Sequence, residues 1–394
     1  MTLARGKFLL PKHLIMQGLW RRKSAAPLGA FAWWFAIVRS CDPARALHPR
    51  NAFQGSYDFS RLCSMSPALR RHVIAGAASK GGRDTIDFAD AAAVRALNAA
   101  LLKADYGIAE WRLPEGKLCP PVPGRADYVH HLADALCDSA GGGAVPQGRQ
   151  VVGLDIGTGA SVIYPLLGSA SYGWRFIGTE SDPESFASAR SIAAANAALD
   201  IDVRFQSSTT RILSGMLGDD ETVDFVMCNP PFFGSPDEFA AASTRKQANL
   251  RLNARKRGSS RRPPSRRAWQ GRGRSGGSGA ARNDERPTSN NFAGGASELW
   301  CPGGEVAFVS DMALESQAYA SRSLWFTSLV SRSENLKTIR QHLTRIEGIQ
   351  SCRTIPMAQG QKASNILLWT FLKPGMHSQW ARQRGWAHAT RGPL

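Results

Sequence analysis

The stretch VVGLDIGTGA, residues 151–160, decides the fold of this chain because it is typical of a buried strand that runs into a glycine-rich turn. A helical stretch, 161–167, follows the turn. Glycine tolerates positive φ and lets the backbone come close to a ligand. Ligands of open α/β sheets bind at the carboxyl ends of the strands. The stretch therefore predicts the first strand and the ligand-binding turn of an α/β sheet.

The spacing of the glycines indicates which ligand this turn binds. A dinucleotide-binding turn has a third glycine three residues after the second, and Val162 occupies that position here. We therefore expect a ribosyl-sulfonium cofactor rather than one with phosphates. The next predicted strand, 174–179, ends in Glu180, whose carboxylate can accept hydrogen bonds from both ribose hydroxyls. Taken alone, Glu180 is equally well interpreted as a solvated acidic residue.

A second motif, Asn229-Pro230-Pro231-Phe232, follows the apolar run 223–228, which is typical of a buried strand. The Asn229 side-chain oxygen and the Pro230 carbonyl can accept the two hydrogens of an amino group attached to a conjugated system. Such bonds localise the nitrogen lone pair as charge develops in the transition state. Phe232 offers a flat face on which a base can stack. An ordinary turn is the alternative interpretation, since Asn-Pro commonly begins a loop.

The order of these features is more specific than any one of them. A glycine-rich turn, an acidic residue one strand later and the Asn-Pro-Pro-Phe motif two strands after that predict an amino-group methyltransferase that uses S-adenosylmethionine. The motif itself leaves adenine, cytosine and a glutamine amide open as acceptors. A non-catalytic RNA-binding protein that keeps the fold is a further alternative, which the intact asparagine and aromatic residue disfavour.

The charge of the chain is unevenly distributed. The net charge is +18, and residues 251–286 contribute eleven arginines and Lys256 against Asp284 and Glu285, a net charge of +10. The segment is also rich in glycine, serine and proline, so we expect a disordered basic insertion. Basic disordered runs contact nucleic-acid phosphates, although a solvated linker is the alternative.

Other residue classes narrow the functional choices. The seven cysteines form no C-x-x-C pair and are odd in number, so we expect no metal site, no disulfide framework and a cytoplasmic location. His130 and His131 are adjacent and are expected on the surface of a helix. The apolar run 25–38 is too short for a comfortable membrane span. We therefore interpret residues 1–46 as a dispensable extension and expect that it is not a membrane anchor. We also expect the protein to be a monomer.

Strands that alternate with helices predict a doubly wound sheet, to which the runs 324–330 and 366–372 would add later strands. Helical spacing over 91–102 follows Asp90, a residue suited to cap that helix. The expected organisation is an extension (1–46), an N-terminal module (47–118), a core (119–375) and a C-terminal tail (376–394).

Several stretches together resemble the ribosomal RNA large subunit methyltransferase F family. The matching stretches are LHPRN (47–51), LCPPVPGRADYVHHLADAL (118–136), DIGTGA (155–160), IYPL (163–166), YGWRF (172–176), CNPPF (228–232), ELWCPGGEVAF (298–308), LWFTSLVSRSENL (324–336) and MAQGQK (357–362). The resemblance implies a class I methyltransferase fold with a small N-terminal RNA-binding module, and N6-methylation of one adenine in 23S ribosomal RNA or in a large-subunit assembly intermediate.

Methyltransferase-like protein sixteen, a eukaryotic relative that acts on a spliceosomal RNA, shares the core motifs. Methylation of another structured RNA, of DNA adenine, or of a glutamine amide in a protein therefore stays open as an alternative. Two departures from the family are visible: the extension before Leu47, and an apparent insertion over 254–286.

The resemblance also implies roles for individual residues. The residues expected to grip the target adenine are Asn229, Pro230, Pro231 and Phe232. Those expected to hold S-adenosylmethionine are Arg125, Asp155, Gly157, Gly159, Ser161, Glu180 and Thr209, with Arg125 meeting the methionine carboxylate. Those expected to contact RNA are His48, Arg50, Asn51, Arg245 and Lys246.

Overall fold

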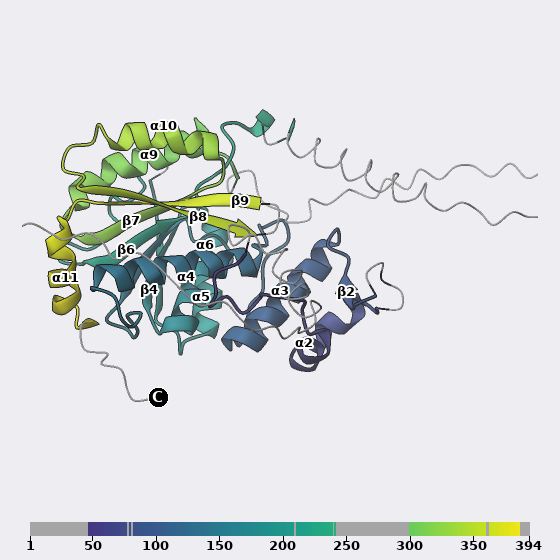
Figure 1. Cartoon of the computed structure of the whole chain (residues 1–394). Coiled ribbons are helices and arrows are strands. Elements are labelled where there is room, and N and C mark those ends of the chain that lie inside the picture. The colour runs from purple at the N-terminus through teal and green to yellow at the C-terminus, as the bar shows by residue number, and fades with distance from the viewer. Residues whose placement is uncertain are drawn as a thin grey trace, which may run out of the picture. The chain divides into compact units, whose positions relative to one another are not determined.

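The computed structural model (Figure 1) describes the central part of the chain. The described residues are 46–76, 79, 82–208, 210–238, 240–241, 299–359 and 362–386. The predicted N-terminal extension, apart from Ala46, and the predicted basic insertion 251–286 lie outside these residues. So do three predicted site residues: Thr209, Arg245 and Lys246.

A seven-stranded sheet with the order β5-β4-β3-β6-β7-β9-β8 forms the centre of the fold. Five strands are parallel: β3 (Val152–Ile156), β4 (Arg175–Glu180), β5 (Ile201–Phe205), β6 (Val223–Cys228) and β7 (Ser323–Val330). Two strands complete the sheet, β9 (Lys362–Thr370) antiparallel to β7, and β8 (Ser351–Gln359) antiparallel to β9. The predicted doubly wound sheet is confirmed, and the final strand begins four residues earlier than expected.

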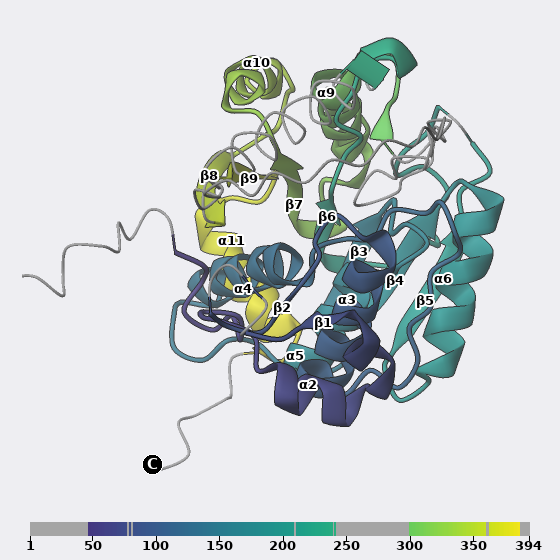
Figure 2. The same ribbon diagram turned by 90° about the vertical axis from the view of Figure 1, so that its right-hand side faces the viewer.

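Helices cover both faces of this sheet (Figures 1 and 2). Every residue of β3, β6 and β7 is buried, as expected for parallel strands covered on two sides. One apolar cluster joins the sheet to α3 (Ala91–Tyr106), α4 (Val122–Ser139), α5 (Ile163–Tyr172) and α6 (Pro183–Ala195). A second joins the opposite face to α9 (Gly304–Ser316) and α10 (Ser333–Leu343). The sheet is therefore the middle layer of three.

The N-terminal module packs directly on the helices of the core. It comprises α2 (Phe59–Met65), the 3-10 helix η2 (Pro67–His72), the short hairpin of β1 (Val73–Ile74) and β2 (Thr85–Ile86), and α3 (Ala91–Tyr106). Asp90 caps α3 by accepting a hydrogen bond from the Ala92 N–H at 2.8 Å, as predicted. Buried side chains of the module, such as Leu69 and Leu101, belong to the same apolar cluster as Phe225 of β6. The module and the core thus share one hydrophobic core.

The C-terminal tail was predicted to begin at residue 376, but this part of the chain is folded. Helix α11 (Pro374–Gln383) packs against α4, and Ala381 and Trp386 are buried. Arg384 forms an ion pair with the buried Asp224 of β6 at 2.7 Å. The helix gives a weak signal in the sequence because most of its residues are polar or small and Ala381 is its one buried residue. The core therefore extends at least to Trp386.

Candidate active site

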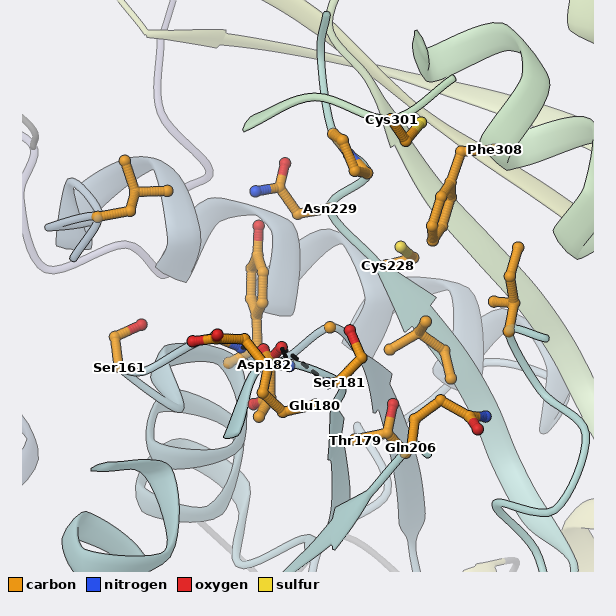
Figure 3. Close-up of a pocket in the computed structure, with 18 of the residues that line it drawn as sticks. Ser161, Thr179, Glu180, Ser181, Asp182, Gln206, Cys228, Asn229, Cys301 and Phe308 are labelled. Carbon is orange, nitrogen blue, oxygen red and sulfur yellow. Dashed lines mark hydrogen bonds between the residues drawn. The ribbon is translucent and has the colours of Figure 1, made fainter. Parts of the chain in front are cut away.

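A pocket of about 300 Å³ opens at the carboxyl ends of β3, β4 and β6 (Figure 3). The strand order places these three ends side by side, since β3 lies between β4 and β6. This is the edge at which ligands of parallel α/β sheets bind. The predicted site residues that line the pocket are Arg125, Gly157, Gly159, Ser161, Glu180, Asn229 and Pro231.

The glycine-rich turn after β3 has the conformation that its sequence predicts. Gly157 and Gly159 take φ of +65° and +66°, which other residues rarely adopt, and a Cβ on either would meet no atom within 4 Å. The turn therefore leaves room for a ligand against its backbone. Val162, at the position of the missing third glycine, has φ of +45° and is the one non-glycine residue with positive φ in the described part of the chain. The helix after it begins at Ile163, two residues later than predicted.

Glu180, at the end of β4, connects the backbone segments on two sides of the pocket through hydrogen bonds. Its Oε2 accepts the backbone N–H of Gly159 at 2.9 Å, and its Oε1 accepts those of Ser181 and Asp182 at 2.8 and 2.9 Å. Burial raises the pKa of this carboxyl, while the three N–H donors oppose the rise. A carboxylate has about four acceptor positions, so Glu180 can still accept a hydroxyl.

Several buried polar atoms around the pocket make no hydrogen bond with any described residue. They are Nε of Arg125, both carboxyl oxygens of Asp155, Oγ1 of Thr158, Oδ1 of Asn229 and Nε1 of Trp300. Buried polar atoms in native proteins nearly always have partners. Their concentration around one pocket therefore indicates a polar ligand. The pocket offers both hydrogen-bond donors and acceptors. Arg125 suits a carboxylate and Glu180 suits hydroxyls, so the site fits an amino acid joined to a ribose.

The protonation of Asp155 depends on its surroundings. The residue lies at the end of β3 and is 1% exposed. Burial is the main reason that the pKa of Asp155 is raised to about 7, and the nearby charge of Glu180 adds to the rise while that of Arg125 opposes it. Without a cationic partner, this carboxyl is therefore largely neutral below neutral pH.

The Asn-Pro-Pro-Phe motif begins where β6 ends, as predicted, and a second segment holds it in place. The N–H groups of Phe232 and Phe233 both donate to the carbonyl of Leu299 at 3.0 Å, and the Cys301 N–H donates to the Phe233 carbonyl at 3.0 Å. Asn229 and Pro231 line the pocket. Pro230 is buried and Phe232 half-buried.

Sequence reasoning missed the segment that lies before α4 and beside the pocket. The Trp111 indole donates to the Ser161 carbonyl at 3.0 Å, and Lys117 forms ion pairs with Asp182 at 2.5 Å and Glu184 at 3.0 Å. Leu118 and Pro120 line the pocket. No motif marks Lys117, because its partners lie more than sixty residues away along the chain.

Sequence reasoning also missed Tyr164 and Trp300. Tyr164 lines the pocket, and its hydroxyl accepts a hydrogen bond from Nη1 of Arg125 at 3.0 Å. This bond fixes the guanidinium over the pocket. Trp300 lies in a stretch that matches the family and was not singled out within it. An aromatic residue in such a stretch is as easily assigned to the core as to a site.

Two of the three predicted RNA-binding residues near the N-terminus are buried instead of displayed. His48 and Asn51 are 6% and 2% exposed. The Asn51 amide donates to the Pro123 carbonyl at 2.9 Å and to Asp127 at 3.0 Å, and the His48 backbone N–H donates to Asp127 at 2.6 Å. Their burial removes the surface that direct contact with RNA requires. In the structure, both anchor the N-terminal module to α4.

Arg50 is partly exposed, and its contacts also attach the N-terminal module to the core. Its guanidinium pairs with Asp134 at 2.8 Å and donates to the Tyr172 hydroxyl at 2.9 Å. His130, expected on a helix surface, is 5% exposed, and its Nδ1 lies 2.7 Å from the same hydroxyl. Burial is the main reason that the pKa of His130 is lowered to about 4. The expectation for His130 was wrong because α5 covers this side of α4.

Two features of other protein classes are absent from the described residues. Among them, no cluster of three or more histidine, cysteine or acidic side chains has the geometry to bind a metal ion. None of the helices they form is both long enough and apolar enough to cross a membrane.

Comparison with known proteins identifies relatives that match most of the chain. A sequence family described as RNA methyltransferase matches residues 42–373. Ribosomal RNA large subunit methyltransferase F of Pseudomonas aeruginosa is 44% identical over 353 residues, which cover 89% of this chain and 95% of that protein. The protein of the same name from Photobacterium profundum is 42% identical over 342 residues, or 86% and 96% of the two chains.

Solved structures with the same fold come from human METTL16. Its catalytic domain in complex with MAT2A 3'UTR hairpin 1 is 30% identical, with a TM-score of 0.61 over 83% of this chain and 96% of that one. The N-terminal domain of human METTL16 in complex with SAH is 26% identical, with a TM-score of 0.59 over 84% and 100% of the two chains.

Proposed function

We propose, because the chain belongs to a family of RNA methyltransferases, that it transfers the methyl group of S-adenosylmethionine to N6 of one adenine in 23S ribosomal RNA. Two features of the relatives support the finer parts of this proposal. Proteins 42–44% identical over most of the chain are named ribosomal RNA large subunit methyltransferase F, and a structural relative binds SAH. We further propose a cytoplasmic enzyme that acts as a monomer on the rRNA or on an assembly intermediate.

One observation carries the proposal most directly. The side-chain oxygen of Asn229 is buried, faces a pocket at the end of β6 and has no partner among the described residues. A buried acceptor without a donor is costly, so its place at a strand end indicates a ligand that brings an N–H group. The exocyclic amino group of a nucleobase is such a donor.

The cofactor side of the pocket suits S-adenosylmethionine, which supplies an electrophilic methyl group when bound. Arg125, held by Tyr164, would receive the methionine carboxylate. Glu180 would accept the ribose hydroxyls, and Asp155 would face the positively charged end of the amino acid. Gly157 and Gly159 leave the space that the ligand needs beside the turn.

The base side of the site activates the nucleophile through positioning. The N6 nitrogen of adenine is a weak nucleophile because its lone pair is delocalised into the ring. Asn229 Oδ1 and the Pro230 carbonyl would accept its two hydrogens and so localise that lone pair where the methyl group is received. The bonds from Phe232 and Phe233 to Leu299 hold the motif rigid for this purpose. Phe232 would stack on the extruded base.

The N-terminal module would present the RNA, with exposed basic residues rather than with His48 or Asn51. Arg70 and Arg71 of η2 are exposed and lie in the same module. Arg245 and Lys246, outside the described residues, are proposed to contact RNA from the segment after the motif. Phosphate contacts of this kind add affinity without sequence preference.

A transfer assay with labelled S-adenosylmethionine tests the proposal. Separate reactions contain unmodified 23S ribosomal RNA, a hairpin RNA, duplex DNA and a protein with an exposed glutamine. We expect label in N6-methyladenine of the 23S RNA, identified after digestion by mass spectrometry. Label confined to DNA, to protein or to the unrelated hairpin would reject the ribosomal assignment.

A further inference from the structure

Trp300 belongs to the pocket although its backbone lies beside the catalytic motif rather than within it. Its backbone forms a parallel bridge with Phe233, and the neighbouring Leu299 carbonyl accepts the N–H groups of Phe232 and Phe233. Trp300 lines the same pocket as Asn229 and Pro231. Movements of the motif and of Trp300 are therefore coupled through backbone hydrogen bonds.

The indole nitrogen of Trp300 has no role in the contacts proposed above for the cofactor or the base. Nε1 is inaccessible to solvent and makes no hydrogen bond with any residue that the structure describes. An indole N–H can only donate, and a buried tryptophan normally finds an acceptor for it. By contrast, the indole of Trp111, beside the same turn, donates to the Ser161 carbonyl. The Trp300 N–H therefore needs an acceptor that the ligand brings.

Asn229 supplies the complementary half of the pattern. Its Oδ1 is an acceptor without a donor, and Nε1 of Trp300 is a donor without an acceptor, in one pocket of the described structure. A group that satisfies both presents an N–H next to an acceptor. In adenine, the N6 amino group stands between two ring nitrogens, N1 and N7, and each is an acceptor. Guanine bound in the same orientation would place the oxygen O6 where adenine has this amino group, and so would leave Asn229 unsatisfied.

We infer that Trp300 is a specificity-determining residue whose indole N–H donates to the ring nitrogen beside the amino group of the target base. The inference rests on the proposed function and assigns a second contact to the same adenine. Asn229 recognises the amino group, and Trp300 recognises its endocyclic neighbour. Discrimination arises because a base without that acceptor leaves the indole N–H buried and unpaired.

The test uses analogues that lack a single ring nitrogen. The methylated adenine is first mapped in a 23S rRNA transcript, and short RNAs that span it are then synthesised with adenine, 1-deazaadenine or 7-deazaadenine at that position. Both analogues keep the amino group and the shape of the ring. Wild-type enzyme and Trp300→Phe, which keeps an aromatic ring but has no N–H, are compared for kcat/KM and for equilibrium affinity for each RNA. Calorimetry with SAH, and the rise in Tm that SAH causes, report whether Trp300→Phe is folded.

We expect wild type to lose about 10- to 100-fold in kcat/KM with one of the two analogues, which identifies the nitrogen that is contacted. Trp300→Phe should lose a similar factor with adenine and show no further loss with that analogue. Its affinity for SAH should equal that of wild type.

Three results would each overturn the inference. The first is equal methylation of all three bases by wild-type enzyme, and the second is discrimination by Trp300→Phe that matches that of wild type. The third is a Trp300→Phe variant whose only change is a lower affinity for SAH, which would assign the indole to the cofactor. The proposed function fails in a different way, namely when wild type methylates none of the RNAs while it still binds SAH. That result rejects the proposed function and this inference together.

Discussion

The carboxylate of Glu180 accepts a hydrogen bond from the backbone N–H of Gly159, with 2.9 Å between Oε2 and the nitrogen. This bond joins the end of β4 to the glycine-rich turn after β3. The other oxygen of the same carboxylate holds the N–H groups of Ser181 and Asp182. A single side chain thus fixes the shape of the two backbone segments between which the cofactor is proposed to bind.

Replacement of Glu180 by glutamine should weaken cofactor binding. The amide keeps the size of the side chain, but it loses the charge and one of the two acceptor oxygens. Hydrogen bonds to charged groups contribute about 1.5–3 kcal/mol, so the affinity for SAH measured by calorimetry should fall about 10- to 100-fold. Asp219→Asn, at an exposed acidic residue, serves as the matched control and should bind SAH as wild type does. An unchanged affinity in Glu180→Gln would remove Glu180 from the cofactor site.

Asp155 should make the stability of the ligand-free protein depend on pH. Its pKa is raised to about 7 in the folded protein, mainly by burial, whereas an unfolded chain has an aspartate pKa of about 3.9. Because the folded state keeps the proton longer, the free energy of unfolding falls as pH rises from about 4 to 7. At 1.36 kcal/mol for each pKa unit, the loss reaches about 4 kcal/mol.

Asp155→Asn removes this titration, so its stability relative to wild type should increase between pH 5 and pH 8. Urea unfolding at the two pH values, without cofactor, measures the difference. A stability difference between the two proteins that is the same at both pH values would contradict the assignment. Saturating SAH should restore the stability of wild type at pH 8, if a cation of the ligand pairs with the carboxylate.

Asn229 should be required for methyl transfer but not for cofactor binding. Removal of one preorganised hydrogen bond to a developing charge typically costs about 10²- to 10³-fold in kcat. We therefore expect kcat of Asn229→Ala to fall by at least this factor. Its affinity for SAH should stay within about twofold of that of wild type, because Asn229 lies outside the proposed cofactor contacts. Asn229→Asp keeps an acceptor oxygen and should retain more activity than the alanine variant. Equal activity of the two variants would show that the oxygen is not the feature that matters.

Asn51 should contribute to stability rather than to direct RNA contact. Its amide makes two buried hydrogen bonds, and its Oδ1 accepts the Phe53 N–H at 3.0 Å. Truncation leaves these partners unsatisfied, so Asn51→Ala should lose about 2–4 kcal/mol of unfolding free energy in urea. Gln54→Ala, at an exposed neighbour, should lose less than about 1 kcal/mol. A selective loss of RNA affinity with unchanged stability would instead return Asn51 to the RNA interface.

The residues that sequence could predict are those whose role is local. The strand β6 and the motif after it follow from six consecutive apolar or buried positions and from the backbone restrictions of two prolines. The glycine-rich turn is likewise encoded within a few residues. Strand β8 was not predicted because it contains Pro356, and a proline argues against a strand unless the strand lies at the edge of the sheet, as β8 does.

The residues that sequence could not predict depend on contacts between distant segments. His48 and Asn51 stand in a polar stretch that is typical of a surface, and only the fold brings Asp127 of α4 against them. The same holds for Trp300, whose significance comes from an unpaired atom in a pocket of the described structure rather than from its neighbours in sequence. Periodicity and spacing report secondary structure and local motifs, but they do not report which side chains meet.

Lys117 should control how long the cofactor stays bound. Its ammonium is paired with Asp182 and Glu184 at the start of α6, and its side chain is 8% exposed. The residues on either side tie the same segment to the pocket, since Trp111 donates to the Ser161 carbonyl and Leu118 lines the cavity. Lys117 is the well-buried member of these ion pairs, since the side chains of Asp182 and Glu184 are 27% and 65% exposed, and its removal leaves both carboxylates without their partner. Lys117→Met, which keeps the aliphatic stem, should therefore loosen this segment and increase the dissociation rate of SAH about 10-fold, the factor that corresponds to 1.4 kcal/mol.

Stopped-flow displacement measures this rate, and Lys103→Met, at an exposed lysine of α3, should leave it unchanged. Equal dissociation rates in Lys117→Met and wild type would show that the segment does not retain the cofactor.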